Sequence, residues 1–278
     1  MINRFIILST IYFLVFSTVG LAERPRISLA PKAGIYSVED VEKEILFGRE
    51  MAAILLSDKT IIADQALSRY VSLVGNSVLQ HANRSDLNFY FAVIKSPEIN
   101  AYAAPGGYIF ITTAALQLMQ NEAELAGVLA HEIAHIADRH IVKVLKIRAD
   151  DKSMTALAGK LTGNNTQSAK IVFDQAVGQA LEILFSKGLN HEDEYNADQQ
   201  GLLLATLSGY DPSQYLNFLD RIRPRIEKDN GELSKTHPGF NERIDRLKSM
   251  ISDEGLLALG RMINKERFMK YRKNGEIE

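Results

Sequence analysis

The sequence predicts an α+β domain that is mainly helical, with a small three-stranded sheet. Apolar, helix-forming residues dominate long stretches of the chain, most clearly residues 125–147. Residues 88–95 alternate in polarity and are rich in Phe, Tyr, Val and Ile, as strands are. Two shorter strands, residues 101–104 and 108–112, flank a Pro-Gly-Gly turn. Helices before and after these strands account for the rest of the domain.

The first helices are predicted from capping and apolar spacing. Ser37 and Asp40 have the spacing of a capping box, which opens a helix over residues 38–56. A second helix is expected over residues 64–79. The Pro105-Gly106-Gly107 turn then separates the two short strands, and a plain turn is the simplest interpretation of its glycines.

The second half of the chain is predicted to be helical. Asn121 and Glu124 cap the helix that contains the apolar run, which we expect to continue unbroken to about residue 148. Residues 149–168 are polar and contain glycine, so they form either a mobile lid or helical hairpin near a cleft, or an ordinary surface excursion. Further helices are expected at residues 171–185, 192–207, 212–225, 240–251 and 255–266.

The apolar run contains the sequence His131-Glu132-Ile133-Ala134-His135. Positions i and i+4 share one face of a helix, so both imidazoles can reach one metal ion. Glu132 lies close enough to act as a base on a metal-bound water. A chance match on an amphipathic helix is the alternative, and a true site needs a third protein ligand.

Glu194 and Asp198 can complete such a site from a second helix. They are also spaced i and i+4, so that one carboxylate can ligate the metal. The other can accept the free ring N–H of a ligand histidine. Acidic pairs of this spacing are usually solvated surface charges, but two histidines of ligand spacing elsewhere favour the metal interpretation.

These motifs together resemble the gluzincin metallopeptidases of the HtpX, CAAX prenyl protease and BepA/LoiP type. The resemblance rests on the His-Glu-x-x-His segment and on the later Glu-x-x-Ala-Asp segment. Further similar segments occur in the family's order at residues 48–52, 100–111, 121–130 and 236–238, followed by Arg243. The resemblance implies a zincin-like metallopeptidase domain whose small sheet lies beside the metal helix.

The expected site holds one Zn²⁺ per chain, bound by His131, His135 and Glu194. Glu132 is the expected catalytic base, and Asp198 the residue that orients a ligand histidine. The chain has no cysteine, so histidine and carboxylate side chains must supply the ligands. Zinc is inferred from these types of ligand.

By resemblance, His237 lies near the same cleft. It either donates a hydrogen bond to the oxyanion of the transition state or occupies the fourth zinc position and keeps the enzyme latent. A loop histidine without contact to zinc is the third possibility. Arg243 either positions this loop or binds substrate backbone.

Two other histidines are not expected to be ligands. His140 follows His131 by nine positions, half a turn out of phase on a continuous helix, so it should point away from the metal. It is interpreted as a surface residue or as a residue supporting the site. His191 precedes Glu194 by three positions, but the family pattern gives it no role.

The resemblance also implies a substrate-binding edge. The family strand beside the metal helix has a free edge to which an extended peptide can add by backbone hydrogen bonds. In this chain that edge is expected at Gly106, Gly107, Tyr108, Ile109 and Phe110.

The amino terminus resembles a secretory leader. A basic Arg4 precedes a short apolar stretch, and small residues precede a cut after Ala22. The expected organisation is a signal peptide over residues 1–22, a linker over 23–36 and one metallopeptidase domain over 37–278. The leader and the resemblance to the BepA/LoiP branch imply a periplasmic protein. No cysteine stands at the cleavage site, so a lipoprotein is not expected. An uncleaved membrane anchor is the alternative.

The leading functional hypothesis is an endopeptidase of the cell envelope that removes misfolded or stalled proteins. A chaperone-like binding factor for outer-membrane protein assembly, with a largely latent zinc site, is the alternative. Expected partners are unfolded proteins and the outer-membrane assembly machinery, with at most peripheral membrane contact. The net charge of −2 argues against nucleic acid.

Overall fold

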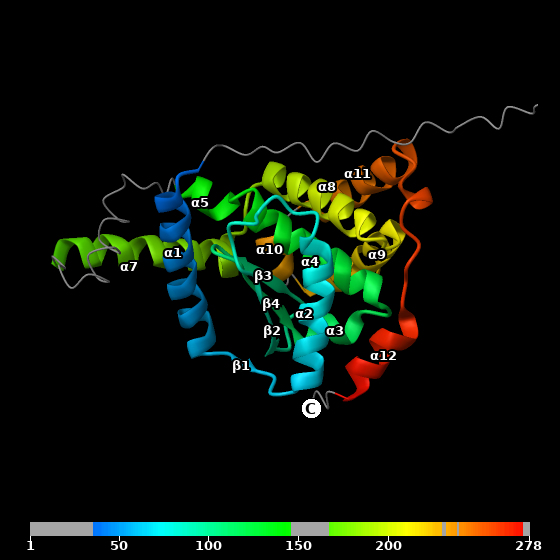
Figure 1. Cartoon of the computed structure of the whole chain (residues 1–278), viewed down its shortest axis with the longest axis horizontal. Helices are drawn as coiled ribbons and strands as arrows, with labels where there is room; N and C mark the ends of the chain where they lie inside the picture. Colours follow the sequence, from blue (N-terminus) through cyan, green and yellow to red (C-terminus); the bar gives the residue numbers. More distant parts are fainter. Residues whose placement is uncertain (1–35, 146–166, 230–231, 238, 275–278) are drawn as a thin grey trace, which may run out of the picture.

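A computed structural model describes residues 36–145, 167–229, 232–237 and 239–274 (Figure 1). The predicted signal peptide, most of the linker and most of the predicted lid lie outside these residues. The described chain is mainly helical with one small sheet, as the sequence predicted. No helix in the described part of the chain is long and apolar enough to cross a bilayer.

The sheet contains four strands in the order β1-β2-β4-β3, where three were predicted. Their bounds are Thr60–Ile61, Tyr90–Lys95, Tyr108–Thr112 and Ala101–Ala104 respectively. The pairing of β2 with β4 is parallel, and the two outer pairings are antiparallel. The missed strand, β1, has two exposed residues, which is too short for an alternating pattern to mark it.

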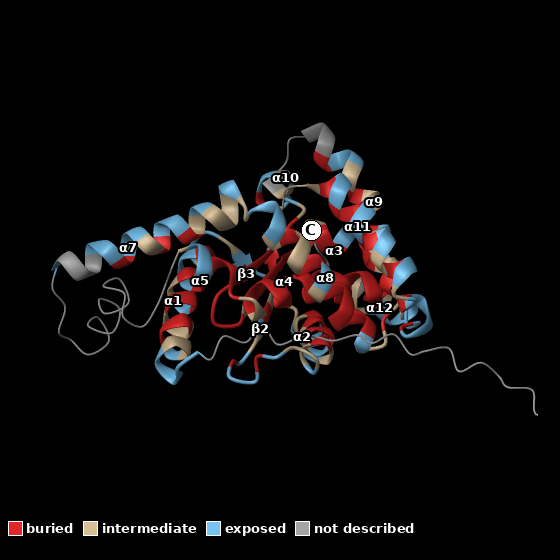
Figure 2. Ribbon diagram, turned by 90° about the horizontal axis from the view of Figure 1, so that it is seen from above, coloured by how far each residue is buried: buried red, intermediate tan, exposed pale blue. Residues whose placement is uncertain are grey.

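Helices cover both faces of the sheet. One face, which includes Val93 and Ile111, packs in the main core with α2 (Gln65–Leu79) and α4 (Glu122–Ala137). On the other face Phe110 packs with Leu55 of α1 (Val38–Ser57). Figure 2 shows α4 and the sheet in the buried centre of the molecule.

The remaining helices surround this centre, and some of them pack against helices other than α4. Their bounds are Thr113–Leu118 for α3, His140–Val144 for α5, Gln167–Glu182 for α7, His191–Leu207 for α8, Pro212–Asp229 for α9, Glu232–Thr236 for α10, Phe240–Asp253 for α11 and Lys265–Asn274 for α12. A π-helical turn, η1 (Ile183–Lys187), follows α7, and a 3-10 turn, η2 (Leu256–Ala258), follows α11. The sequence did not predict α3, α10 or α12.

The helix predicted over residues 255–266 is wrong. Only η2 forms before α12 begins at Lys265, and between the two Met262 forms a parallel bridge with Tyr210. The amides of Arg261 and Met262 both donate to the Gly209 carbonyl, which satisfies backbone groups that a helix would have paired internally. A tertiary contact thus overrides the local helical pattern.

The main helix is also shorter than predicted. It ends at Ala137, and Arg139 adopts a left-handed backbone conformation with φ 56° before α5 begins at His140. This break changes the direction of every side chain that follows it.

Candidate metal centre

Helix α4 brings two histidines to one face. Asn121 caps its first turn by accepting from the Glu124 amide at 3.0 Å, and every residue from Glu122 to Ile136 is buried. The Nε2 atoms of His131 and His135 approach each other to 3.0 Å. The i,i+4 spacing therefore places both imidazoles as predicted.

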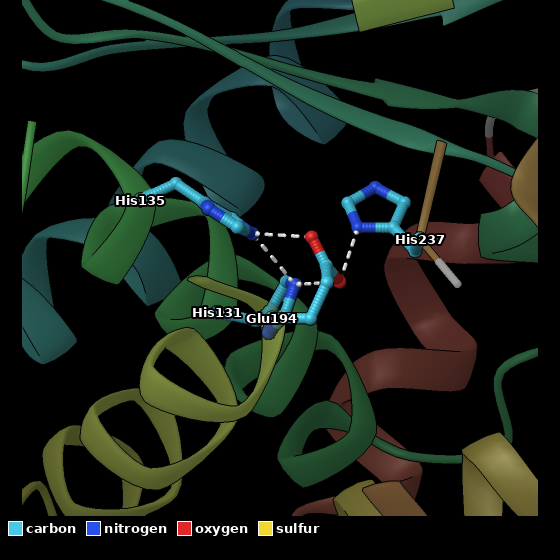
Figure 3. Close-up of side chains that lie close together, drawn as sticks. All are labelled: His131, His135, Glu194 and His237. Atoms are coloured by element: carbon cyan, nitrogen blue, oxygen red, sulfur yellow. Dashed lines mark hydrogen bonds and ion pairs between the residues drawn. The ribbon is translucent and has the colours of Figure 1, made fainter. Parts of the chain in front are cut away.

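Helix α8 supplies a carboxylate between them. Glu194 Oε1 lies 3.4 Å from His135 Nε2, and Glu194 Oε2 lies 3.6 Å from His131 Nε2 (Figure 3). The two helices can approach this closely because Gly201 faces the α4 backbone. A Cβ added there would lie 2.8 Å from the His131 nitrogen.

The donor set fits a divalent metal ion. Ligand atoms of His131, His135, Glu194 and His237 all lie within 4.8 Å of one another. Glu194 Oε1 is buried without a hydrogen-bond partner among the described residues, as expected of an atom whose partner is an ion. Imidazole and carboxylate ligands, with cysteine absent, suit zinc.

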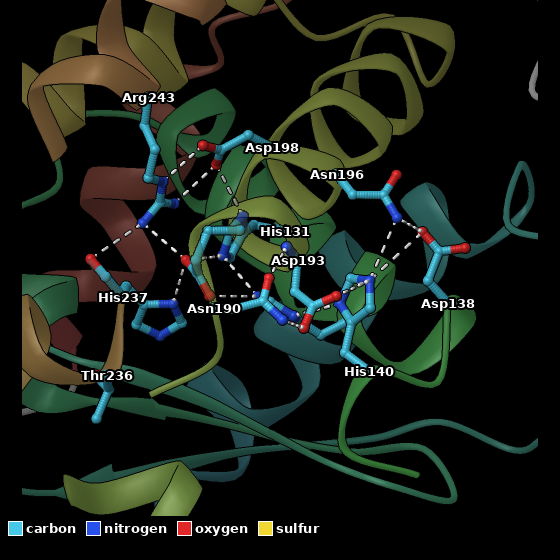
Figure 4. Close-up of polar contacts among 12 residues, drawn as sticks. His131, Asp138, His140, Asn190, Asp193, Asn196, Asp198, Thr236, His237 and Arg243 are labelled. Atoms are coloured by element: carbon cyan, nitrogen blue, oxygen red, sulfur yellow. Dashed lines mark hydrogen bonds and ion pairs between the residues drawn. The ribbon is translucent and has the colours of Figure 1, made fainter. Parts of the chain in front are cut away.

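A second layer of polar contacts holds this set in place (Figure 4). Asp198 Oδ1 lies 3.0 Å from His131 Nδ1, the ring atom that faces away from the cluster. Arg243 donates to both oxygens of Asp198, at 2.6 and 2.8 Å, and its Nη1 lies 2.9 Å from Glu194 Oε2. The structure thus places Asp198 and Arg243 beside the ligand set.

Tyr215 belongs to this layer but was missed by the sequence analysis. Its hydroxyl donates to Asp198 Oδ1 at 3.0 Å from helix α9. No motif surrounds it, and a buried tyrosine on an amphipathic helix looks like an ordinary core residue. Only the packing of α9 against α4 and α8 reveals the contact.

His237 follows α10 and reaches the cluster. Its Nδ1 lies 2.9 Å from Glu194 Oε2, and its amide donates to the Leu233 carbonyl at 2.8 Å. The third possibility considered for this residue, a loop histidine remote from the site, does not match this position. His191 is exposed and lies 3.4 Å from the Tyr195 hydroxyl, outside the ligand cluster.

His140 does not point away from the cluster, as a continuous helix had predicted. Because α4 breaks before it, His140 is buried and its Nδ1 lies 2.8 Å from His135 Nδ1. Of the two roles considered for it, the surface role is wrong.

The prediction that residues 106–110 form a free strand edge for substrate is also wrong. Tyr108, Ile109 and Phe110 lie in β4, which is paired with β2 on one side and β3 on the other. Gly106 and Gly107 form the turn packed against α1 and the 88–89 backbone. Among the described strands, β3 has the outer edge nearest the cluster, since α4 contacts β3.

Two small cavities adjoin the cluster. One, of about 20 Å³, lies between Ala103, Glu132, His135, His237 and residues of η1. The other, of about 40 Å³, is lined by the same Glu132 and His237 together with mainly apolar side chains from the sheet connection, α4, α9 and α10. Both cavities are therefore closed in part by the segment that carries His237.

The two α4 histidines have opposite tendencies to protonate. Burial lowers the pKa of His135 far below its usual value. Burial also opposes charge on His131, but the Asp198 and Glu194 carboxylates raise the pKa of His131 to about 9. Of the two histidines, His131 is therefore the one whose surroundings favour the positively charged imidazolium.

The buried carboxylates also differ. Burial raises the pKa of Glu132 above its usual value, which is the direction expected for a carboxylate that acts as a general base. Burial acts in the same direction on Glu194, but His237 and Arg243 lower the pKa of Glu194 well below its usual value. Against burial, Arg243 lowers the pKa of Asp198 to about 2. The proposed ligand stays ionised while the proposed base can exchange a proton.

The chain is similar in sequence to several known proteases. The chain is 27% identical over 224 residues to the beta-barrel assembly-enhancing protease of Escherichia coli K12, covering 73% of this chain and 42% of the relative. It is 21% identical over 226 residues to the metalloprotease LoiP of E. coli K12, covering 80% and 85%. It is 26% identical over 202 residues to the mitochondrial metalloendopeptidase OMA1 of Schizosaccharomyces pombe, covering 70% and 56%.

The chain spans less than half the length of the beta-barrel assembly-enhancing proteases it matches. The model of peptidase family M48 matches residues 65–251, which include α4, α8, His237 and Arg243. With the described geometry, this match shows that the chain belongs to the M48 family of metallopeptidases.

Proposed function

We propose that the protein is a zinc-dependent endopeptidase of the bacterial cell envelope that cleaves misfolded or stalled outer-membrane proteins. The observation that carries the proposal is the convergence of four ligand atoms within 4.8 Å, with Glu132 on the same helix turn as His131. A binding protein without hydrolytic activity would need the ligands but not this buried base.

His131, His135 and Glu194 would hold the zinc ion. When bound, zinc supplies a Lewis acid that acidifies water and polarises the substrate carbonyl. Glu132 takes the proton of the attacking water and passes it to the leaving amine. Asp198 keeps the outer nitrogen of His131 engaged, so that Nε2 faces the metal.

His237 is proposed to keep the resting enzyme latent. Its position among the ligand atoms supports occupation of the fourth metal position, from which it would exclude water. The adjoining cavities of about 20 and 40 Å³ have room for only a few waters. Displacement of the His237 segment would therefore open both the metal and the space beside it.

Extended, unfolded segments are the proposed substrates. Such a segment would add to the outer edge of β3, residues Ala101–Ala104, in place of the β4 edge expected from sequence. Because all four β3 residues are buried, the segment that carries His237 would first have to move aside. Backbone pairing tolerates many sequences, which suits removal of damaged proteins. The secretory leader resemblance supports a periplasmic protein, and the relatives named as beta-barrel assembly-enhancing proteases support a role in outer-membrane assembly.

The test combines bound zinc with cleavage of unfolded casein by the purified protein and two variants. Wild type is expected to hold about one zinc per chain. Glu132→Gln should retain zinc and lose cleavage by at least about 100-fold, because the base is gone. His237→Ala should cleave faster than wild type if the latent state is correctly assigned.

Other outcomes separate the parts of the proposal. Absence of zinc from wild type would refute the metal assignment. Slower cleavage by His237→Ala would instead assign His237 to stabilisation of the transition state. Zinc without cleavage in wild type and His237→Ala would favour the alternative, a binding factor for outer-membrane assembly.

A further inference from the structure

The two proposed ligand histidines are held from behind by different groups. Asp198 contacts the outer nitrogen of His131 at 3.0 Å, and His140 contacts the outer nitrogen of His135 at 2.8 Å. We propose that His140 is a positioning residue that fixes the ring orientation and tautomer of His135. This inference rests on the proposed function, because it takes His135 as a metal ligand.

A hydrogen bond between Nδ1 of His135 and Nδ1 of His140 requires that one of the two nitrogens carries a proton and the other does not. For His135 to offer the lone pair of Nε2 to a metal, its proton must lie on Nδ1. That N–H then donates to Nδ1 of His140, which must in turn carry its own proton on Nε2. The contact therefore selects one tautomer in each ring.

The surroundings of His140 favour that tautomer. Its Nε2 lies 4.0 Å from Asp138 Oδ2 and 3.9 Å from Asp193 Oδ1, so two carboxylates face this side of the ring. Asn196 Nδ2 donates to the same Asp138 oxygen at 3.0 Å, and its longer 3.4 Å contact with His140 Nε2 is not a hydrogen bond in this tautomer, because both nitrogens are donors (Figure 4). Negative charge at this end stabilises an N–H at Nε2 and leaves Nδ1 as the acceptor that His135 needs.

The backbone is built to bring His140 to this position. The left-handed conformation of Arg139 is uncommon for a residue with a side chain and persists only where surrounding contacts fix it. Those contacts come from a buried network. Arg139 Nε lies 3.0 Å from Glu44 Oε2, and Arg84 binds both oxygens of Glu44 and donates to the Ile136 carbonyl at 2.8 Å.

This network ends α4 at the turn after His135. Without the break, His140 would lie half a turn from the ligand face and could not contact His135. The left-handed backbone of Arg139 and the buried ion pairs of Glu44 with Arg84 and Arg139 thus hold the His140 imidazole in place. A role for His140 as a mere core filler would not require this placement of its ring nitrogen.

The test compares His140→Leu, His140→Asn and His81→Leu in the full protein. His140→Leu removes the acceptor, His140→Asn can retain one near the position of Nδ1, and His81 lies outside the cluster. Zinc affinity is measured by chelator competition, and the ligand field by the absorption spectrum of the cobalt(II)-substituted protein. Thermal unfolding of the metal-free forms reports any loss of fold.

His140→Leu is expected to weaken zinc about 10- to 100-fold and to shift the cobalt spectrum. His140→Asn should recover affinity to within about fivefold of wild type, because its amide oxygen can accept the same hydrogen bond. His81→Leu should match wild type in both measurements. Recovery by asparagine separates positioning from simple packing, because leucine and asparagine both lack the imidazole ring.

Two results would overturn the inference. One is a His140→Leu protein with wild-type affinity and cobalt spectrum. The other is an equal loss of affinity in both His140 variants, which would show that the acceptor does not matter. In either case wild type still binds zinc, so the proposed function stands. Wild type that binds no zinc would refute the proposed function instead.

Discussion

At the residue scale, one guanidinium group controls the charge of the candidate metal centre. Arg243 is buried and contacts both Glu194 and Asp198. Its planar fork can bind a carboxylate through two N–H groups and still reach a second carboxylate. The Arg243 charge offsets the burial cost of both carboxylates, and through them it sets the positions of a proposed ligand and of the His131 partner.

Arg243→Lys is therefore predicted to be a damaging substitution although the charge is retained. A single ammonium cannot reach both carboxylates, so one buried charge loses its partner. The free energy of unfolding should fall by about 3 kcal/mol, and zinc affinity by about tenfold or more. Urea unfolding and chelator competition measure the two effects.

Arg246→Lys provides the matched control on the same helix. Arg246 is exposed and pairs with exposed Glu242, so its replacement should change stability by less than about 0.5 kcal/mol. If Arg243→Lys unfolds like this control, the double contact has no energetic role.

At the element scale, the close crossing of α4 and α8 sets the geometry of the ligands. Gly201 lies on α8 where a Cβ would come within 2.9 Å of the His131 Cα. Glu194 and Asp198 lie on the same helix, so any outward shift of α8 moves both away from the histidines. Because residue 201 is glycine, α8 can approach α4 closely enough for Glu194 to reach the two histidines.

Gly201→Ala should destabilise the protein even though alanine is the better helix former. Overlap with the α4 backbone is expected to cost about 2 kcal/mol after the gain in helix propensity, and zinc affinity should fall with it. Gly178→Ala in α7 is the control. Nothing lies within 4 Å of a Cβ there, so this change should stabilise by about 0.5–1 kcal/mol. Equal effects of the two substitutions would contradict the close-crossing explanation.

At the scale of the whole molecule, a buried carboxylate fastens the carboxy-terminal segment to the core. Glu122 opens α4 and accepts from Tyr70, Tyr210 and Asn264, as well as from Arg267. Burial opposes its charge, but the bonds from Arg267, Tyr70 and Asn264 lower the pKa of Glu122 below its usual value. These contacts join α2, α4, the loop after α8 and α12.

The stability supplied by Glu122 should depend on pH. A lowered folded-state pKa means that the contribution is fully present above the unfolded-state value, 4.5, and disappears as pH falls through the folded-state value. Glu122→Gln should therefore lower the free energy of unfolding by about 2 kcal/mol at pH 7. The deficit should shrink as pH falls below 4.5 towards the lower folded-state pKa of Glu122, where the carboxylate takes up a proton in folded wild type as well.

Denaturant unfolding of both proteins between pH 7 and pH 3 measures this difference. Glu242→Gln, at the exposed ion pair with Arg246, should change stability by less than about 0.5 kcal/mol at pH 7. A Glu122→Gln deficit that stays constant over the whole range would show that charge on Glu122 does not stabilise the fold.

Local patterns were sufficient for most of the elements. The structure contains the predicted capping box at Ser37 and the predicted cap at Asn121. Asp64 caps α2 at the predicted start of that helix. The strands β2, β3 and β4 also lie where alternation and turn residues placed them. Such features depend on neighbours within a few positions, so a sequence reveals them directly.

The i,i+4 rule likewise determined which residues could share a metal. His131 with His135, and Glu194 with Asp198, follow from helical geometry alone, since each pair lies within a single helix. That the two pairs meet was expected from the need of a zinc site for a third ligand and from resemblance to known metallopeptidases, because spacing alone does not show how α4 and α8 cross.

By itself the sequence determined the helical α+β class, the local elements and the residues with ligand spacing. The tertiary structure alone decided the break after Ala137, the contact of His140 with His135, the role of Tyr215 and the central position of β4. Each of these depends on partners far along the chain, such as Glu44 and Arg84 for the break. Spacing within one element contains no information about such partners, whereas packing brings them within hydrogen-bond distance.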